Sequence, residues 1–127
     1  MMRPPARTKL SEAEWRVVKD EIRAILIELA RSRQTITYSG LCLRLQTVTL
    51  HPHSFVFTRI LREVCGEELE KGHRMLCALV VAKATGMPGG GYFGAMALLG
   101  ADASDLEARW REDLEDVFTY WSQEGKG

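Results

Sequence analysis

The stretch from Ser11 to Arg31 constrains the fold most, because it combines a helix start signal with one continuous apolar face. Ser11 and Glu14 have the spacing of a capping box, and Leu10 and Trp15 are placed as a hydrophobic staple. The apolar residues that follow recur with helical spacing; they are Trp15, Val18, Ile22, Ile25, Leu26 and Leu29. The sequence therefore predicts a helix from about Glu12 to Arg31.

The next stretch has the composition of a short strand followed by two more helices. The run 35–38 (Thr-Ile-Thr-Tyr) favours extended structure. We expect Ser39 to cap a short helix that ends near Leu45. A turn or loop through His53 should follow this helix. A third helix should begin near Pro52 or Ser54. A glycine at position 66 is expected to interrupt this helix, and the glycine at position 72 is expected to stop it. The leucines of the short helix (Leu41, Leu43 and Leu45) are expected to be partly buried.

The second half of the chain contains an apolar run and then a glycine-rich segment. The run Met75–Val81 predicts a buried strand. The segment 83–91, with four glycines and one proline, predicts the tip of a hairpin, with Tyr92 and Phe93 returning toward the core. Residues 94–99 are expected to form a short helix, and Ser104 with Glu107 forms a second capping box for a final amphipathic helix.

These elements predict an α+β, mostly helical fold with a helix-turn-helix core and a β-hairpin wing. This winged-helix-like core would be packed by the amphipathic N-terminal and C-terminal helices. The chain has 127 residues, which fits one domain. We expect residues 1–10 to form a flexible basic arm and residues 11–124 to form a single domain.

Three phrases resemble the C-terminal winged-helix domain of DNA alkyltransferases and alkyltransferase-like proteins. They are the run 36–41 (Ile-Thr-Tyr-Ser-Gly-Leu), the pair Val80–Val81 and the run 90–92 (Gly-Gly-Tyr). The resemblance places Cys77 where that family carries its acceptor cysteine. The family's motif Pro-Cys-His-Arg is absent, since Leu76, Ala78 and Leu79 stand at the neighbouring positions. A thiolate nucleophile needs a base or a cation beside it, so we expect a non-enzymatic protein.

A second resemblance covers nearly the whole chain. The phrase 72–81 (Gly-His-Arg-Met-Leu-Cys-Ala-Leu-Val-Val), the phrase 85–93 (Thr-Gly-Met-Pro-Gly-Gly-Gly-Tyr-Phe) and the phrase 117–121 (Val-Phe-Thr-Tyr-Trp) are similar to segments of a family of small uncharacterised bacterial proteins. This resemblance implies no particular activity.

Cysteine and histidine usage indicates neither a disulfide framework nor a metal site. The three cysteines, at positions 42, 65 and 77, are odd in number and widely spaced, so we expect reduced and mostly buried thiols. His51, His53 and His73 lack the spacing of zinc ligands. No apolar run is long enough to span a membrane. We therefore expect a cytoplasmic protein with no metal and no cofactor.

Charge is unevenly distributed along a chain whose formal net charge is zero. Between positions 31 and 62 there are five arginines and no acid, whereas positions 102–127 contain eight acids and three bases. In a winged helix the third helix enters the major groove of duplex DNA, so this basic region predicts DNA binding. The predicted nucleic-acid contacts are Tyr38, Ser39, Arg44, Ser54, Thr58, Arg59, Arg62 and Lys83.

A protein partner is the alternative. Phe55, Val56 and Phe57 are consecutive in the predicted third helix, and an exposed aromatic residue there would favour docking of a partner protein or of a second copy. The acidic final helix would then be either a solvated face or a surface that pairs with a basic patch. The sequence leaves both functions open.

Overall fold

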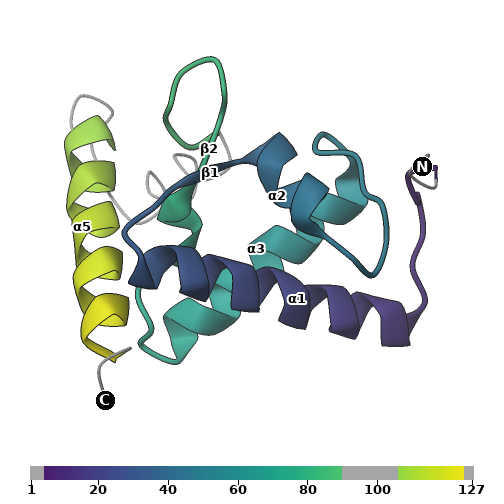
Figure 1. The fold of residues 1–127 in the computed structure, drawn as a ribbon, viewed down its shortest axis with the longest axis horizontal. Coiled ribbons are helices and arrows are strands. Elements are labelled where there is room, and N and C mark those ends of the chain that lie inside the picture. Colours follow the sequence, from purple (N-terminus) through teal and green to yellow (C-terminus); the bar gives the residue numbers. More distant parts are fainter. Residues whose placement is uncertain (1–4, 90–105, 125–127) are drawn as a thin grey trace.

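The structure, a computed structural model, describes residues 5–89 and 106–124. Within these residues the chain is α+β and mostly helical. The elements, in chain order, are α1 (Glu12–Arg31), β1 (Ile36–Thr37), α2 (Tyr38–Arg44), α3 (Phe55–Glu70), the 3-10 helix η1 (Leu76–Leu79), β2 (Val80–Val81) and α5 (Leu106–Glu124). In Figure 1, α1 crosses in front of α3, and α5 stands beside the C-terminal end of α1.

Helix α1 has the bounds and the cap that the sequence predicts. The Ser11 hydroxyl accepts a hydrogen bond from Glu14 N at 3.1 Å, and the Glu14 carboxylate accepts one from Ser11 N at 2.9 Å. This reciprocal pair satisfies two backbone donors that a helix start leaves without partners. The buried positions of α1 follow one face, namely Val18, Ile22, Leu26, Leu29 and Ala30.

Helix α2 starts earlier than predicted and has a different cap. The Thr37 hydroxyl accepts a hydrogen bond from Gly40 N at 2.9 Å, so Thr37 is the N-cap and Ser39 is an exposed residue of the first turn. The expected burial of Leu43 is also wrong, because its side chain is 63% exposed whereas Leu41 is fully buried. A helix of seven residues turns only one face to the core.

Helix α3 is continuous through Gly66, so the predicted interruption is wrong. The Ser54 hydroxyl caps its start by accepting from Phe57 N at 3.2 Å. The predicted stop is confirmed at Gly72, which has a positive φ of 78° and donates its N–H to the carbonyl of Leu69 at 3.0 Å. Glycine adopts this left-handed conformation without steric cost.

The predicted buried strand at Met75–Val81 is only two residues long. Leu76–Leu79 forms η1 instead, and Val80–Val81 forms β2, which pairs in parallel with β1 through the registers Ile36↔Val80 and Thr37↔Val81. A longer buried strand would need a longer partner for its backbone groups. The 3-10 turns meet part of that need internally, and the indole of Trp110 on α5 donates to the carbonyl of Ala78 at 2.9 Å.

After β2 the chain turns back on itself. Ala82 N donates to the carbonyl of Met87 at 2.8 Å, and Gly86 N donates to the carbonyl of Ala82 at 2.8 Å. A returning wing strand at Tyr92–Phe93, the short helix at 94–99 and the cap at Ser104 lie outside the described residues. The β-hairpin of a winged helix is therefore absent from the part of the chain that the structure describes.

The main core lies where α1, α3, η1 and α5 meet. Its largest fully buried side chains include Phe57, Ile22, Leu26, Ile60 and Leu76. Trp121 and Val117 on α5 join the same cluster. Helix α5 is thus part of the core, and α3 packs against both α1 and η1.

A substitution at Gly66 tests whether α3 is continuous and open to solvent at this position. A Cβ atom built on Gly66 meets no atom of the described residues within 4 Å, and its backbone is helical. Glycine in a helix interior costs about 1 kcal/mol relative to alanine. We therefore expect Gly66→Ala to raise the free energy of unfolding by about 1 kcal/mol, measured by urea denaturation. A loss of stability would contradict this prediction.

Candidate functional site

The five arginines of the predicted basic region do not form one outward face. The Arg33 guanidinium pairs with the Glu115 carboxylate of α5 and lies 5.2 Å from the centre of the Phe118 ring. The Arg31 guanidinium lies over the Trp121 ring of the same helix at 5.9 Å. Two of the five arginines are therefore directed at α5 and hold it against the C-terminal end of α1.

Arg59 and Arg62 border different hollows of the surface. Arg59 lies over the Trp15 ring at 5.8 Å and its Nε atom is 3.6 Å from the Glu63 carboxylate, so it belongs to the contact between α3 and α1. Arg62 lines a groove on another side of α3. These two predicted DNA contacts therefore border different parts of the surface.

The other predicted contact residues are dispersed or used within the fold. Ser39, Arg44 and Lys83 are exposed and make no hydrogen bond or ion pair with the described residues. Ser54 caps α3, and the Thr58 hydroxyl donates to the Ser54 carbonyl at 3.0 Å.

Tyr38 has a structural hydrogen bond. Its hydroxyl accepts from Gly89 N at 2.8 Å and so ties the turn after β2 to the start of α2. Tyr38, Thr58 and Arg62 line the same groove, which is the one place where the structure brings several predicted residues together.

This groove on α3 has a volume of about 530 Å³, within the usual range for ligand and partner sites. Its described lining comes from α3, from the loop before α3, from Tyr38, and from the segment that runs through η1, β2 and the following turn. The lining residues are Tyr38, Pro52, His53, Phe57, Thr58, Leu61, Arg62, Cys65, Gly66, Leu69, Met75, Cys77, Val80, Ala82 and Gly89. We call it the α3 groove.

The α3 residues of the groove form one stripe along the helix. Positions 58, 61, 62, 65, 66 and 69 recur at the intervals that place residues on one helical face. At 1.5 Å per residue this stripe is about 16 Å long. The groove is therefore elongated along the helix axis.

The described lining of the groove is apolar and carries little charge. Arg62 is its one residue with a permanent charge, no aspartate or glutamate contributes to it, and Arg62 makes no ion pair with any described residue. Leu69, at one end of the stripe, is 45% exposed. Phe55, in the first turn of α3, is 75% exposed, which is unusual for a large aromatic side chain.

A disulfide between Cys65 and Cys77 forms part of the groove lining. Its Cα atoms are 5.6 Å apart, and it joins α3 to η1. The expectation of reduced thiols is wrong for these two residues, whereas Cys42 is buried as expected and lies outside the disulfide. The pairing also means that Cys77 holds no free thiol in this structure.

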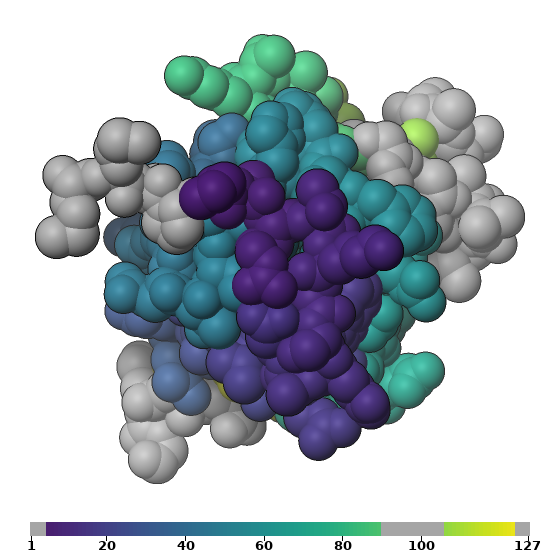
Figure 2. Space-filling view, turned by 90° about the vertical axis from the view of Figure 1, so that its right-hand side faces the viewer, coloured from purple at the N-terminus to yellow at the C-terminus, as the bar shows by residue number. Residues whose placement is uncertain are grey.

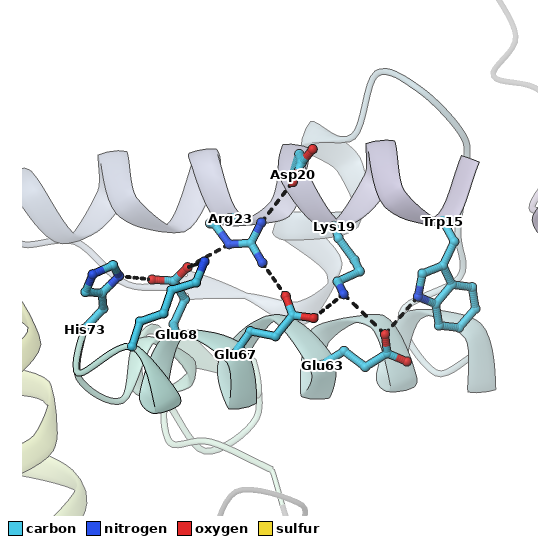
Figure 3. A network of polar contacts seen from close by, with 9 residues as sticks. Trp15, Lys19, Asp20, Arg23, Glu63, Glu67, Glu68 and His73 are labelled. Atoms are coloured by element: carbon cyan, nitrogen blue, oxygen red, sulfur yellow. Dashed lines mark hydrogen bonds and ion pairs between the residues drawn. The ribbon is translucent and has the colours of Figure 1, made fainter. Parts of the chain in front are cut away.

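A chain of charged residues joins α1 to α3 (Figure 3). Lys19 on α1 pairs with Glu67 and also lies 3.5 Å from Glu63. Arg23, also on α1, lies 2.6 Å from Glu67 and 2.7 Å from Glu68. The Arg23 Nε–H does not point at Glu68, so that contact is an ion pair rather than a hydrogen bond.

Glu68 is the buried centre of this chain of charges, with 1% of its surface exposed. Its carboxylate also lies 2.6 Å from His73 Nδ1 and 3.8 Å from Lys71 Nζ. The His73 ring faces Tyr120 and Trp121 of α5 at centroid distances of 6.0 Å and 5.5 Å. Burial of a carboxylate is tolerated when cations lie beside it. Glu68 of α3 thus contacts α1 directly through Arg23, and it is connected to α5 through the His73 ring.

The carboxylate–imidazole pair of Glu68 and His73 is the kind of pair that can orient a general base for a nucleophile. Within the described part of the chain the His73 ring faces the aromatic rings of Tyr120 and Trp121, and the Cys77 thiol is used in the disulfide. Within residues 5–89 and 106–124, no group of histidine, cysteine or acidic side chains has the arrangement of a metal site. No helix of the described residues is long and apolar enough to cross a membrane.

Arg7 is anchored beside α1. Arg7 N donates to the carbonyl of Thr49 at 2.8 Å, and the Arg7 guanidinium forms two hydrogen bonds with Glu14, at 2.9 Å and 3.0 Å. Figure 2 shows this dark purple segment lying on the surface formed by the residues around position 50. Arg7, followed by the Ser11 backbone, lowers the pKa of Glu14 to about 2.

The ion pairs of Glu67 predict a loss of stability in acid. The hydrogen bond from Lys19 lowers the pKa of Glu67 below 4.5, and the Arg23 charge adds to this effect. A lowered pKa in the folded state stabilises the fold above the unfolded value, and this contribution disappears as the pH falls through the folded value. We expect the free energy of unfolding to fall from about pH 5 downward, and to fall less steeply in Glu67→Gln.

Urea denaturation at several pH values checks this expectation, with Glu70→Gln as a control at an exposed position of the same helix. Identical pH profiles for the wild type and Glu67→Gln would contradict it.

Comparisons with known proteins give no relatives. No protein-family model, no curated protein and no solved structure matches the chain.

Proposed function

We propose that this chain is a non-enzymatic binding module whose α3 groove receives an apolar segment of a partner protein. The observation that carries the proposal is the groove itself, an apolar hollow of about 530 Å³ along one face of a core helix. Apolar side chains exposed along a groove are stabilised when a partner removes them from water.

The shape of the groove favours a polypeptide over a compact small molecule. The stripe from Thr58 to Leu69 spans three helical turns, and a partner helix presents anchors at matching intervals along its own axis. The exposed Phe55 supplies a further aromatic surface at the N-terminal end of α3. Aromatic residues are enriched at the centres of protein interfaces.

The proposal is tested by selecting peptides and blocking the groove. A display library of helix-favouring peptides of about 16 residues, long enough for four turns, is selected on the full chain. The blocking variant is Gly66→Trp, because a side chain at this position enters open space within the groove. The matched control is Gly66→Ala, which adds only a methyl group.

We expect selected peptides to bind the wild type and Gly66→Ala alike, and to bind Gly66→Trp about 100-fold more weakly. Circular dichroism and the melting temperature establish that both variants fold. Failure to select any peptide that Gly66→Trp rejects would overturn the proposal.

Duplex DNA is a second candidate ligand, supported by the exposed cations that have no acidic partner. Arg44, Arg62 and Lys83 make no ion pair with the described residues, so they are free to meet phosphates. Three of the five arginines in the basic region are engaged by acidic or aromatic side chains, and for this reason we place DNA second.

Salt dependence distinguishes DNA binding from weak charge attraction. Three phosphate contacts give a slope of about −2.7 in a plot of the logarithm of affinity against the logarithm of salt concentration. Arg44→Ala and Arg62→Ala should each reduce the slope by about 1. Absence of binding to a duplex of about 20 base pairs at low salt would remove this candidate.

A further inference from the structure

The identity of two groove residues, Gly66 and Arg62, carries information about the partner. The inference rests on the proposed function, because it concerns the segment that the α3 groove receives. We infer that the partner segment is an amphipathic helix that places a small residue against Gly66 and a carboxylate beside Arg62.

Gly66 is unfavourable for the helix that contains it. Glycine destabilises a helix interior relative to alanine, and here neither a positive φ nor a nearby atom of the described residues requires it. What a glycine gives at such a position is a close approach of another backbone. Since Gly66 is one of the residues of the groove stripe, the partner backbone approaches α3 most closely there.

The small residue on the partner follows from helix packing. The distance between the axes of two packed helices depends on the side chains at the contact, and it is smallest where both are small. A large side chain facing Gly66 would hold the helices apart and leave Leu69, which is 45% exposed, incompletely covered. Glycine, alanine or serine at the facing position allows Leu69 to be buried.

The carboxylate follows from the charge of the groove. Arg62 is the one permanently charged residue of the described lining, and it has no acidic partner among the described residues. A partner that covers the groove removes water from this guanidinium, which is costly unless an acid compensates the charge. An aspartate or glutamate gives two parallel hydrogen bonds to a guanidinium.

The position of the acid relative to the small residue is also defined. Arg62 and Gly66 are four residues apart on α3, or about one helical turn. The acid and the small residue of the partner should therefore be three or four residues apart on its own helix, on the same face as its apolar anchors.

A charge exchange tests the inference. The same library of helical peptides is selected separately on the wild type and on Arg62→Glu, with Gly66→Trp used to discard peptides that bind elsewhere. We expect wild-type peptides to contain an acid three or four residues from a glycine, alanine or serine. On Arg62→Glu the acid should be replaced by lysine or arginine.

Individual affinities complete the test. A wild-type peptide should bind Arg62→Glu at least about tenfold more weakly, and replacing its acid by lysine should restore binding. Peptides that bind the groove with no preferred charge, or that lose no affinity to Arg62→Glu, would overturn this inference and leave the proposed function standing. Absence of any groove-binding peptide would overturn the proposed function itself.

Discussion

Arg23→Met is expected to lower the free energy of unfolding by about 3 kcal/mol, because it leaves the buried Glu68 carboxylate without its closest guanidinium. Removal of one partner of a buried ion pair costs about 3–5 kcal/mol. The lower end applies here, since His73 and Lys71 still lie beside Glu68. Urea denaturation near neutral pH measures the loss.

Two further variants show whether the burial of charge is the cause. Arg16→Met removes an arginine from the same helix whose side chain is 76% exposed, and it should cost less than about 1 kcal/mol. The double variant Arg23→Met/Glu68→Leu removes both charges, so it should be more stable than the sum of the two single variants implies. Additive losses would contradict the role of Glu68 as a buried acid that depends on Arg23.

Reduction of the Cys65–Cys77 disulfide is expected to lower the free energy of unfolding by about 3 kcal/mol. The two residues are 12 positions apart, and opening a loop of this size restores conformational freedom to the unfolded chain. The measurement is urea denaturation of the protein with and without a phosphine reductant. The double variant Cys65→Ala/Cys77→Ala should have the stability of the reduced wild type.

The reductant also provides the control for this prediction. The double variant keeps Cys42, which is buried and outside the disulfide, so any effect of reductant on this variant would not come from the Cys65–Cys77 bond. We expect none. A wild type whose stability does not change under reducing conditions would show that the disulfide does not contribute to the fold.

The sequence predicted the helices where local signals and periodicity agree. The Ser11–Glu14 capping box and the apolar face after it gave the bounds of α1 correctly, and the positive φ of Gly72 explains why the third helix ends there. The strand prediction at Met75–Val81 failed for a tertiary reason. An apolar run of this length fits a strand or a buried turn equally well, and only the packing of α1, α3 and α5 around it selects the 3-10 helix.

The α3 groove was missed because its signal overlaps with that of the core. In the sequence, Phe57, Leu61 and Leu69 have the pattern of ordinary core-facing helix positions, and Gly66 is typical of a helix interruption. The recurrence of Leu61, Cys65 and Leu69 at helical spacing was the available sign. The disulfide had no such sign, because the distance between Cys65 and Cys77 depends on how η1 returns to α3.

The basic region shows the limit of counting charges along a sequence. Positions 31–62 contain no acidic residue, but acidic residues from other parts of the sequence can still pair with these arginines in the folded protein. Glu115 comes from α5 to Arg33, and Glu63 lies one turn beyond Arg59. The resemblances to alkyltransferase-like proteins and to small bacterial proteins stay predictions, as does a cytoplasmic location.

The central claim is that partner helices bind along the α3 groove, and amide chemical-shift mapping tests it most directly. A selected peptide is added to isotope-labelled protein, and the shifted amides are located on the structure. The account predicts that the largest changes fall in the groove lining, from Thr58 to Leu69 and around Val80 to Gly89. Changes concentrated on the α1 or α5 surfaces, with the groove unaffected, would contradict it.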